Sequence, residues 1–322
     1  MNTSTQNKPR VLGIVGATAS AKTTLSLPLA QALNCEIVCM DSMQIYRRMD
    51  IGTAKPTADE RALIPHHMLD IVEPTEPFSV AQYVEQARAV ITDIVHRGRV
   101  PMLVGGTGLY LQGLTLPMDY GGLPSDPAIR KRLTEQAERE GAASMHARLA
   151  AVDPPAAARL HPNDQRRVIR ALEIYELTGI PMSQHRTPTQ ADAPYDFSLY
   201  AVDWPRAELH ARINQRVDQM LANGLMQEVQ ALLDSGVSED AQSMQGLGYK
   251  EILDWMGGNY SYEEAVRVLK RDTRHFAKRQ LTWFRREGEV TWVDKDNFDY
   301  DDSRILSYML SVCREKGILP AK

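Results

Sequence analysis

The segment VLGIVGATASAKTTLSL, residues 11–27, carries the clearest structural signal in the sequence. A short apolar run precedes a turn of small residues, and a helical pattern begins at Lys22. A strand, a turn and a helix in this order form a phosphate-binding loop when the turn reads G-x-x-x-x-G-K-[ST]. Gly16, Lys22 and Thr23 match that pattern, whereas Ala21 stands where the second glycine belongs. The segment therefore predicts an anion site made by backbone N–H groups and a helix N-terminus.

The residues of this loop have separate expected roles. Lys22 would reach a terminal phosphate, and Thr23 would place its hydroxyl on Mg²⁺. Alanine at position 21 is tolerated if its φ is negative, whereas a positive φ would strain the loop by roughly 1 kcal/mol or more. The sequence leaves open whether the loop is intact or impaired. The predicted phosphate-binding residues are Gly16, Ala17, Thr18, Ala19, Ser20, Ala21, Lys22 and Thr23.

Strand-like and helix-like segments alternate along the chain. Strands are expected at residues 10–16, 36–41, 66–72, 100–106 and 198–204, with a further short strand possible at 289–294. Helices are expected between them at 22–33, 80–98 and 107–114. This alternation predicts an α/β fold, with a parallel-sheet core like that of P-loop NTPases and helices on both faces.

The character of the chain changes near residue 118. A segment rich in turn formers is followed by helical patterns at 128–152 and 162–179, then by a second loop-like segment. We therefore expect a helical insertion domain at 118–196. The catalytic core would comprise residues 1–117 and 197–322, and its last part, as far as about residue 287, is mostly helical.

The composition is that of an ordinary globular protein of 322 residues, with 43% hydrophobic residues, 24% charged residues and a formal net charge of −4. With that net charge, any nucleic-acid surface must be a local basic patch. Cys35, Cys39 and Cys313 predict buried thiols in a reducing compartment, without a disulfide framework or a zinc site. No apolar run of about 18 residues and no secretory leader is visible, so we expect a cytoplasmic protein outside the membrane. We also expect a monomer.

Two further segments place polar groups where strands are expected to end. Asp41 ends the second predicted strand, and Thr107 follows the glycine-rich turn after the fourth. Ligands of open α/β sheets bind beyond the carboxyl ends of the strands. Asp41 would therefore lie beside the loop of residues 16–23, where a carboxylate can act as a general base or a metal ligand. A solvated loop aspartate is the alternative interpretation.

Residues 267–286 predict a helix with a stripe of cations. At 100° per residue, Leu269, Phe276 and Trp283 fall opposite that stripe. Cations above an apolar anchor are typical of a surface that contacts a nucleic-acid backbone, although a solvated helix face remains the alternative. The stripe contains Arg267, Lys270, Arg271, Arg274, Lys278 and Arg285.

Taken together and in order, seven motifs resemble the bacterial tRNA dimethylallyltransferases. The resemblance runs from about residue 11 to residue 294. The motifs are GATASAKT, DSMQIYRRMDIGTAKP, PHHMLDIV, LVGGTGLY, HPNDQRRVIRALEIY, GLGYKEI and AKRQLTWFR.

The resemblance implies transfer of the dimethylallyl group of dimethylallyl diphosphate to N6 of the adenosine beside the tRNA anticodon, at position 37. The loop would then hold the diphosphate with Mg²⁺, and Asp41 would take the N6 proton. Arg212 or Arg216 would clamp the diphosphate. Thr107 would act near the same centre and contact tRNA. The anticodon arm would be contacted by Asp41, Ser42, Met43, Gln44, Thr107, Arg130, Gln165, Arg166, Arg167, Val168, Ile169, Arg271, Arg274 and Lys278.

The chain departs from the family pattern at three positions. Ala17 replaces a proline of the loop, Ala21 replaces its glycine, and Arg48 stands where the family usually has glycine. One alternative interpretation is a small-molecule P-loop kinase, or a transferase acting on free adenine nucleotides. Another is a tRNA-binding homologue whose catalysis is impaired by Ala21.

Overall fold

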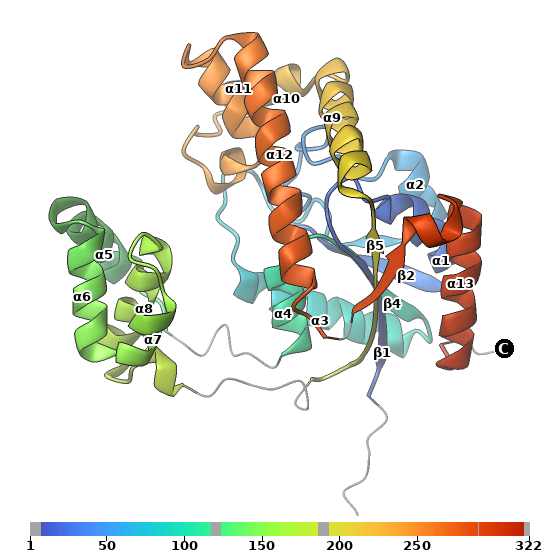
Figure 1. Ribbon diagram of the computed structural model, residues 1–322, viewed down its shortest axis with the longest axis horizontal. Coiled ribbons are helices and arrows are strands. Elements are labelled where there is room, and N and C mark those ends of the chain that lie inside the picture. The colour runs from blue at the N-terminus through green and yellow to red at the C-terminus, as the bar shows by residue number, and fades with distance from the viewer. Residues whose placement is uncertain (1–7, 117–123, 186–192, 289, 319–322) are drawn as a thin grey trace, which may run out of the picture. The chain divides into compact units, whose positions relative to one another are not determined.

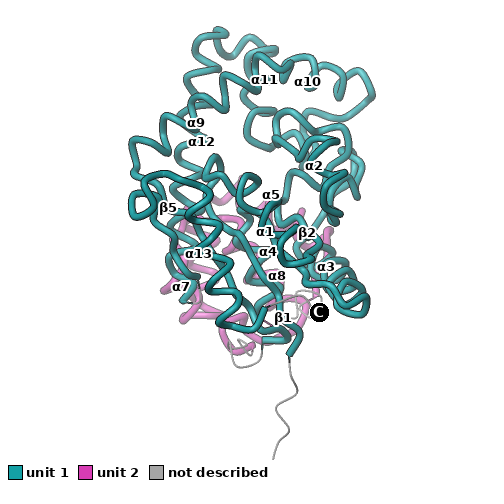
Figure 2. The backbone as a smooth tube through the Cα atoms, turned by 90° about the vertical axis from the view of Figure 1, so that its right-hand side faces the viewer, with its two compact units in different colours: residues 1–115, 193–322 teal, residues 116–192 magenta. Residues whose placement is uncertain are grey.

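A computed structural model describes residues 8–116, 124–185, 193–288 and 290–318 (Figure 1). The chain divides into two compact units, coloured separately in Figure 2. Unit 1 comprises Met1–Thr115 and Ala193–Lys322, and unit 2 comprises Leu116–Asp192. The predicted helical insertion, 118–196, and unit 2 thus share most of their residues.

Unit 1 is built on a six-stranded sheet in the order β3-β2-β4-β1-β5-β6. All neighbouring strands are parallel, and β1 is central, with Leu12 beside Met102 of β4 and Gly13 beside Leu199 of β5. The strands are β1 (Arg10–Val15), β2 (Cys35–Met40), β3 (His66–His67), β4 (Val100–Gly105), β5 (Asp196–Asp203) and β6 (Val290–Asp294). Parallel strands joined by helices confirm the predicted α/β fold.

Helices cover both faces of this sheet (Figure 1). On one face, α1 (Lys22–Ala32) and α13 (Asp302–Glu315) pack on Leu12 and Ile14 in a shared apolar core. The other face carries α3 (Val80–His96) and α4 (Gly108–Thr115). The short α2 (Ala58–Leu63) has a capping box between Thr57 and Glu60.

Four further helices follow β5 and extend unit 1 beyond the carboxyl edge of the sheet (Figure 1). They are α9 (Arg206–Ala222), α10 (Leu225–Asp234), α11 (Tyr249–Met256) and the long α12 (Tyr262–Phe284). Ala17 of the loop after β1 packs with Leu209 and Ile213 of α9 and Ala277 of α12. Two helices distant in sequence therefore support the phosphate-loop segment.

Unit 2 is a small helical bundle. It consists of α5 (Pro127–Glu140), α6 (Ala142–Val152), α7 (Pro154–Arg159) and α8 (Gln165–Thr178). Leu133, Leu149, Val168 and Leu172 form the centre of its apolar core. The stretch predicted as helical at 128–152 is two helices, because Gly141 between them has a φ of 83°.

Two local predictions need correction. The strand predicted at 66–72 is only two residues long, because Met68 and Asp70 take positive φ angles of 61° and 53°. The sequence analysis also missed α7, a short proline-led helix. Parts of the two loop-like segments, residues 117–123 and 186–192, lie outside the described residues. The prediction of buried thiols is confirmed, since all three cysteines are free and buried.

Within the described parts of the chain, no helix is both long and apolar enough to cross a lipid bilayer.

Candidate active site

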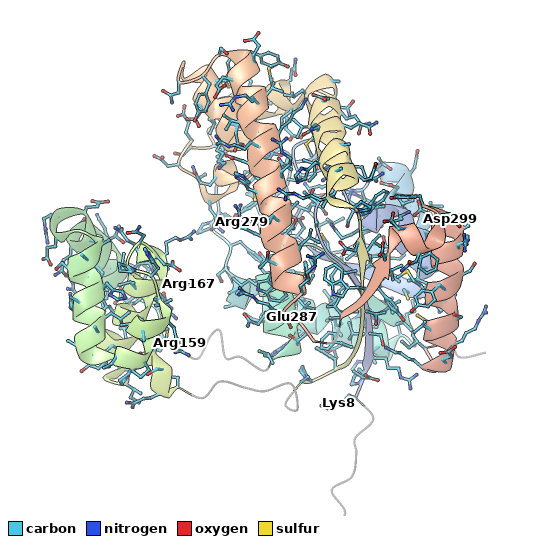
Figure 3. The ribbon with its side chains drawn as sticks, viewed as in Figure 1. Lys8, Arg159, Arg167, Arg279, Glu287 and Asp299 are labelled. Atoms are coloured by element: carbon cyan, nitrogen blue, oxygen red, sulfur yellow. The ribbon has the colours of Figure 1, made fainter. Side chains whose placement is uncertain are left out.

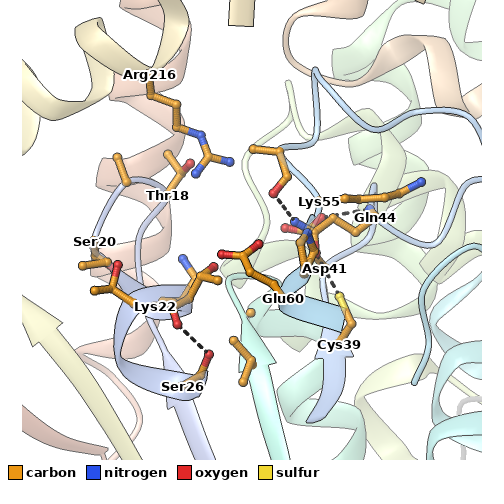
Figure 4. A pocket seen from close by; sticks show the side chains of 18 of the residues that line it. Thr18, Ser20, Lys22, Ser26, Cys39, Asp41, Gln44, Lys55, Glu60 and Arg216 are labelled. Carbon is orange, nitrogen blue, oxygen red and sulfur yellow. Dashed lines mark hydrogen bonds between the residues drawn. The ribbon is translucent and has the colours of Figure 1, made fainter. Parts of the chain in front are cut away.

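The segments that follow β1 and β2 meet the end of β4 at the carboxyl edge of the sheet, around one cavity of about 560 Å³ (Figure 4). Residues 18–23 of the loop line it, together with Asp41, Gln44, Arg212 and Arg216. This brings together groups from β1, β2 and α9 that lie up to about two hundred residues apart. Gly16, Ala17 and Thr107 are not among the lining residues.

The backbone of the loop has the left-handed turns that glycine normally supplies. Gly16 has a φ of 131°, and Ala19 has a φ of 62°. Ala21, the N-cap of α1, lies in the left-handed region with φ 70° and ψ 27°. Alanine in this region costs roughly 1–2 kcal/mol relative to right-handed backbone. The φ of Ala21 is therefore positive, and of the two cases that the sequence left open the strained one applies.

Side chains from outside the loop hold its carbonyl groups. Trp204, just after β5, donates its indole N–H to the Ser20 carbonyl at 3.2 Å. Arg212 of α9 donates from Nε to the Ala19 carbonyl at 2.9 Å. Lys22 donates to the carbonyls of Gly16 and Ala17 at 3.2 and 2.6 Å. With its carbonyls held in this way, the loop keeps a shape in which its N–H groups can meet an anion.

Lys22 is the loop's own cation. Burial lowers the pKa of its ammonium group from 10.5 to about 8, and the nearby positive charge of Arg216 adds to this effect. The carboxylate of Asp41 acts in the opposite direction. An anion bound between Lys22 and Arg216 would offset both the burial of the Lys22 charge and its repulsion by Arg216. Such an arrangement is expected of a phosphate site.

Arg212 and Arg216 have different surroundings, which bears on the choice the sequence left open. The Arg212 guanidinium lies over the Trp204 ring, 4.2 Å from its centroid, while its Nε bonds the loop. Arg216 points into the cavity beside Thr18 (Figure 4). Its Nε is buried without a hydrogen-bond partner among the described residues, and its NH2 makes only a long contact with the Thr53 carbonyl at 3.4 Å. Arg216 is therefore the arginine with donors to offer a ligand.

A second polar group at the cavity, this one in the loop, also lacks a partner among the described residues. The Ser20 hydroxyl is buried, and no hydrogen-bond partner for it is found among the described residues. Buried polar groups without partners are uncommon and call for an explanation. Ser20 and Arg216 both line the cavity, so a bound anion would satisfy both.

Asp41 directly follows β2, and its carboxylate is fixed by its own turn. Its Oδ1 accepts the backbone N–H groups of Met43 and Gln44 at 2.9 and 3.4 Å. Within the described residues, its Oδ2 receives no hydrogen bond, and the residue lines the cavity. One oxygen thus orients the carboxylate while the other remains available to accept a proton.

Thr107 supports that same turn. Its Oγ1 accepts the Ser42 N–H at 3.0 Å, and its own N–H donates to the Met40 carbonyl at 3.2 Å. The glycines before it permit this approach, because a Cβ on Gly105 would lie 2.0 Å from the Met40 carbonyl oxygen. The structure thus gives Thr107 a place behind Asp41 rather than on the cavity wall.

The predicted tRNA-contact segment at 42–44 is only partly exposed. Gln44 donates from Nε2 to the carbonyls of Thr53 and Ala54 at 3.0 and 3.2 Å. The Met43 methyl group lies against Gly246, where a Cβ would be 2.3 Å away. These contacts tie the segment to the loop of residues 50–56 and to the GLGYKEI motif.

The basic stripe of α12 is largely neutralised by partners. Lys270 pairs with Asp218 of α9 at 2.6 Å, and Arg274 donates to the Asn214 side chain at 2.7 Å. Of the six stripe side chains, only that of Lys278 has no partner among the described residues. The remaining pairs are Arg267 with Glu264, Arg271 with Asp272, and Arg285 with Asp203.

Other predicted contacts lie in unit 2. Gln165, Arg166 and Arg167 are exposed at the start of α8, and Figure 3 shows Arg167 at the surface of the unit. Arg130 is half-exposed, but its guanidinium is held by the buried carboxylate of Glu173 at 2.9 Å.

The prediction was wrong for the side chains of two residues in the same segment. Val168 and Ile169 are 0% and 6% exposed and belong to the core of unit 2. They lie on the inward face of α8, so they pack the bundle and are not available to RNA.

Reasoning from the sequence missed several residues around the cavity. Gln280 and Phe276 of α12 line it, and Glu60 of α2 points into it (Figure 4). Trp204 supports the loop from behind. Phe276 had been interpreted only as an apolar anchor opposite the cations, and the AKRQLTWFR motif was interpreted through its cations rather than through Gln280.

The oxygen atoms around the cavity could hold a magnesium ion only together with oxygens of a bound phosphate ligand. Among the described residues, no three His, Cys, Asp or Glu side chains cluster closely enough to hold a metal. Thr23 and Asp41 do line the same cavity. Mg²⁺ is commonly held by one or two protein oxygens together with substrate phosphates and water, and these residues fit that arrangement.

Comparison with known families gives two matches. Residues 44–287 match the family described as IPP transferase, and residues 9–67 match the one described as isopentenyl transferase. Among curated proteins, tRNA dimethylallyltransferase 1 of Trichlorobacter lovleyi is 53% identical, over 89% of this chain and 94% of its own. The tRNA dimethylallyltransferase of Pelotomaculum thermopropionicum is 47% identical, over 98% and 100%.

Solved structures give the same result. The tRNA isopentenylpyrophosphate transferase of Bacillus halodurans superimposes with a TM-score of 0.71 at 44% identity, covering 96% of this chain and 98% of its own. A eukaryotic dimethylallyltransferase acting on tRNA superimposes with a TM-score of 0.77 at 31% identity, covering 89% and 74%.

Proposed function

This chain belongs to the IPP transferase family, and from that premise we propose that it transfers the dimethylallyl group of dimethylallyl diphosphate to tRNA. The acceptor is N6 of the adenosine at position 37, beside the anticodon. The observation that carries the proposal is one cavity that joins the predicted phosphate loop, an oriented carboxylate and an arginine whose Nε has no hydrogen-bond partner among the described residues.

The diphosphate is bound by the loop. Its oxygens accept the N–H groups at the N-terminus of α1, with Lys22, the Ser20 hydroxyl and Arg216 around them. Negative charge grows on the diphosphate as the bond from its oxygen to C1 of the dimethylallyl group breaks. Fixed cations and N–H groups aimed at that charge stabilise the transition state.

Asp41 acts on the acceptor. The exocyclic amine of adenine is a weak nucleophile, and its nitrogen becomes more acidic as it bonds to C1. The free Oδ2 of Asp41 takes the N6 proton while Oδ1 stays fixed by the turn. The products are N6-dimethylallyladenosine and diphosphate, and the adenosine must leave its stack to enter the cavity.

Mg²⁺ is the proposed cofactor. Thr23 is the residue that would hold it, through its hydroxyl, and when bound the ion would neutralise charge on the diphosphate oxygens. The anticodon arm is the proposed macromolecular partner, held by exposed cations such as Lys278 and Arg167.

The kinase alternative has less support. An ATP-dependent kinase shares the loop, but it does not account for relatives named as transferases over nearly the whole chain. Titration calorimetry separates the two, since the proposal predicts tighter binding of dimethylallyl diphosphate than of ATP.

Asp41 offers the direct test of the mechanism. We expect the Asp41→Asn variant to bind both substrates and to lose roughly 10²-fold or more in single-turnover rate, as general-base catalysis typically contributes that much. Asp240, an exposed aspartate near the end of the loop after α10, provides the matched control as Asp240→Asn. An unchanged rate in the Asp41→Asn protein would remove the carboxylate from the mechanism.

A further inference from the structure

One buried glutamine forms hydrogen bonds with two loops of the site, which follow the neighbouring strands β1 and β4. Gln280 lies on α12 and is only 6% exposed. Its Oε1 accepts the N–H of Thr18 in the phosphate loop at 2.8 Å. Its Nε2 donates to the carbonyl of Gly106, in the turn after β4, at 2.8 Å. The side-chain amide thus spans both loops, with its acceptor on one and its donor on the other.

The turn held by this amide leads directly to the catalytic side of the cavity. Gly106 precedes Thr107, whose hydroxyl accepts the Ser42 N–H and whose N–H donates to the Met40 carbonyl. Those contacts flank Asp41 on both sides. A continuous path of hydrogen bonds therefore runs from the phosphate loop through Gln280 to the segment that carries the proposed base.

Steric fit at this point is close. A Cβ on Gly106 would lie 2.1 Å from Gln280 Nε2, so only glycine lets the amide reach the turn. One helical turn away, Ala277 of α12 packs against Ala17 of the loop, and Phe284 is fully buried. The backbone around Gln280 is therefore fixed, and its side chain cannot move away from either loop without leaving polar groups unpaired.

We propose that Gln280 is a positioning residue that sets the separation between the diphosphate and the acceptor amine. This inference rests on the proposed transfer reaction. An in-line reaction requires the reacting atoms about 3–3.5 Å apart, and a displacement of about 1 Å can cost 10²-fold in rate. Because α12 also carries the basic stripe, tRNA that docks on this helix contacts the same element that spaces the two loops.

Two substitutions distinguish the hydrogen bond of Gln280 to Thr18 from its hydrogen bond to Gly106. Gln280→Met has a similar length and makes neither hydrogen bond. Gln280→Glu keeps an acceptor for the Thr18 N–H, but in its charged form it has no proton to donate to Gly106. When the glutamate is protonated, it can again make both bonds. Gln230→Met, at an exposed glutamine of α10, is the matched control.

For the methionine variant we expect kcat/KM for dimethylallyl diphosphate to fall by roughly 10–100-fold, with a lower kcat as well as a higher KM. For the glutamate variant we expect activity relative to wild type to recover as the pH is lowered. The charged and titratable groups that line the same cavity are common to both proteins, so the ratio to wild type removes their contribution; they are Lys22, Asp41, Glu60, His66, Arg212 and Arg216.

Binding of inorganic diphosphate, measured by calorimetry, separates this inference from the proposed function. The positioning role is supported if Gln280→Met binds diphosphate more weakly than wild type, while Gln230→Met does not, and if Gln280→Met keeps an intact melting transition. This result would count even if the wild-type protein fails to modify tRNA. Equal diphosphate binding and equal kcat in Gln280→Met and Gln230→Met would overturn it. So would a glutamate variant whose activity relative to wild type is the same at every pH.

Discussion

At the scale of single residues, two departures from the family pattern share one backbone property. Ala21 and Arg48 are the two positions at which the family resemblance led us to expect glycine, and both have positive φ, 70° and 62°. The backbone strain at Arg48 is offset by two contacts of its side chain. One is an ion pair with Glu73 at 3.1 Å, and the other is a hydrogen bond to Ser235 at 3.0 Å. Ala21 has no side-chain contact of this kind to offset its strain.

The first prediction concerns that strain. Ala21→Gly should remove roughly 1 kcal/mol of strain from the folded state, offset by about 0.4–1 kcal/mol of added freedom in the unfolded chain. We therefore expect a melting temperature that is unchanged or slightly higher, and tighter binding of diphosphate. Ala89→Gly, at an exposed position within α3, is the control and should lower the unfolding free energy by about 1 kcal/mol. Equal destabilisation by both substitutions would show that Ala21 is unstrained.

The second prediction concerns the protonation of Lys22. Its pKa in the free protein is about 8, and only the charged form binds diphosphate well. We expect kcat/KM for dimethylallyl diphosphate to decline as the pH rises through about 8. A Lys22→Arg variant should not show that decline, because arginine stays protonated throughout the range. A profile that is flat to pH 10 in the wild-type protein would contradict the role of Lys22.

At the scale of elements, the sequence predicted most of the sheet because each strand is a compact apolar run. It could not predict the early end of β3, which depends on the positive φ of Met68 and Asp70. Asp70 is held there by Lys55 at 2.5 Å and Arg61 at 2.7 Å, contacts between segments that no local pattern reveals. Gln280 was missed for the same reason, since its partner Thr18 lies 262 residues away.

The amino end of β2 carries a buried carboxylate that links three elements. Glu36 is 2% exposed and accepts hydrogen bonds from Arg97 after α3 and from His67 of β3, at 2.8 and 2.7 Å. The bond with Arg97 is the main cause that lowers the pKa of this carboxyl from 4.5 to about 2.

The third prediction follows from this depressed pKa. Stability contributed by Glu36 is fully present above about pH 4.5 and is lost as the pH falls toward about 2. The unfolding free energy of Glu36→Gln should therefore lie below that of wild type at pH 7, and the gap should narrow across this window. Denaturant titrations from pH 7 to pH 2 measure the gap. A constant gap would mean that the carboxylate is not preferentially stabilised in the folded state.

The fourth prediction tests the stripe of α12. Arg271 and Arg274 already have partners, whereas Lys278 has none among the described residues. Lys278→Ala should therefore weaken tRNA binding and flatten its salt dependence, by up to about 0.7–0.9 in log–log slope for one lost phosphate contact. Lys131→Ala, an exposed lysine of α5, serves for comparison. An unchanged slope in the Lys278→Ala protein would make the stripe a solvated face.

At the scale of the whole molecule, the chain consists of an α/β unit with the cavity and a helical unit inserted in it. The sequence indicated this division from a change in composition alone. It could not tell which side of α8 is buried, because Gln165–Ile169 has two arginines followed directly by two aliphatic residues, before the helical period becomes clear. The helical unit is consequently a proposed RNA-binding surface only through its exposed residues, Gln165, Arg166 and Arg167.

The most direct measurement is incubation of the purified protein with labelled dimethylallyl diphosphate, Mg²⁺ and unmodified tRNA, followed by nucleoside analysis. We predict label in N6-dimethylallyladenosine at position 37, with one diphosphate released for each group transferred. Omitting tRNA, or replacing Asp41 with asparagine, should abolish or strongly reduce the product. Tight binding of both substrates without any labelled nucleoside would contradict the account and would instead indicate a tRNA-binding protein that has lost catalysis.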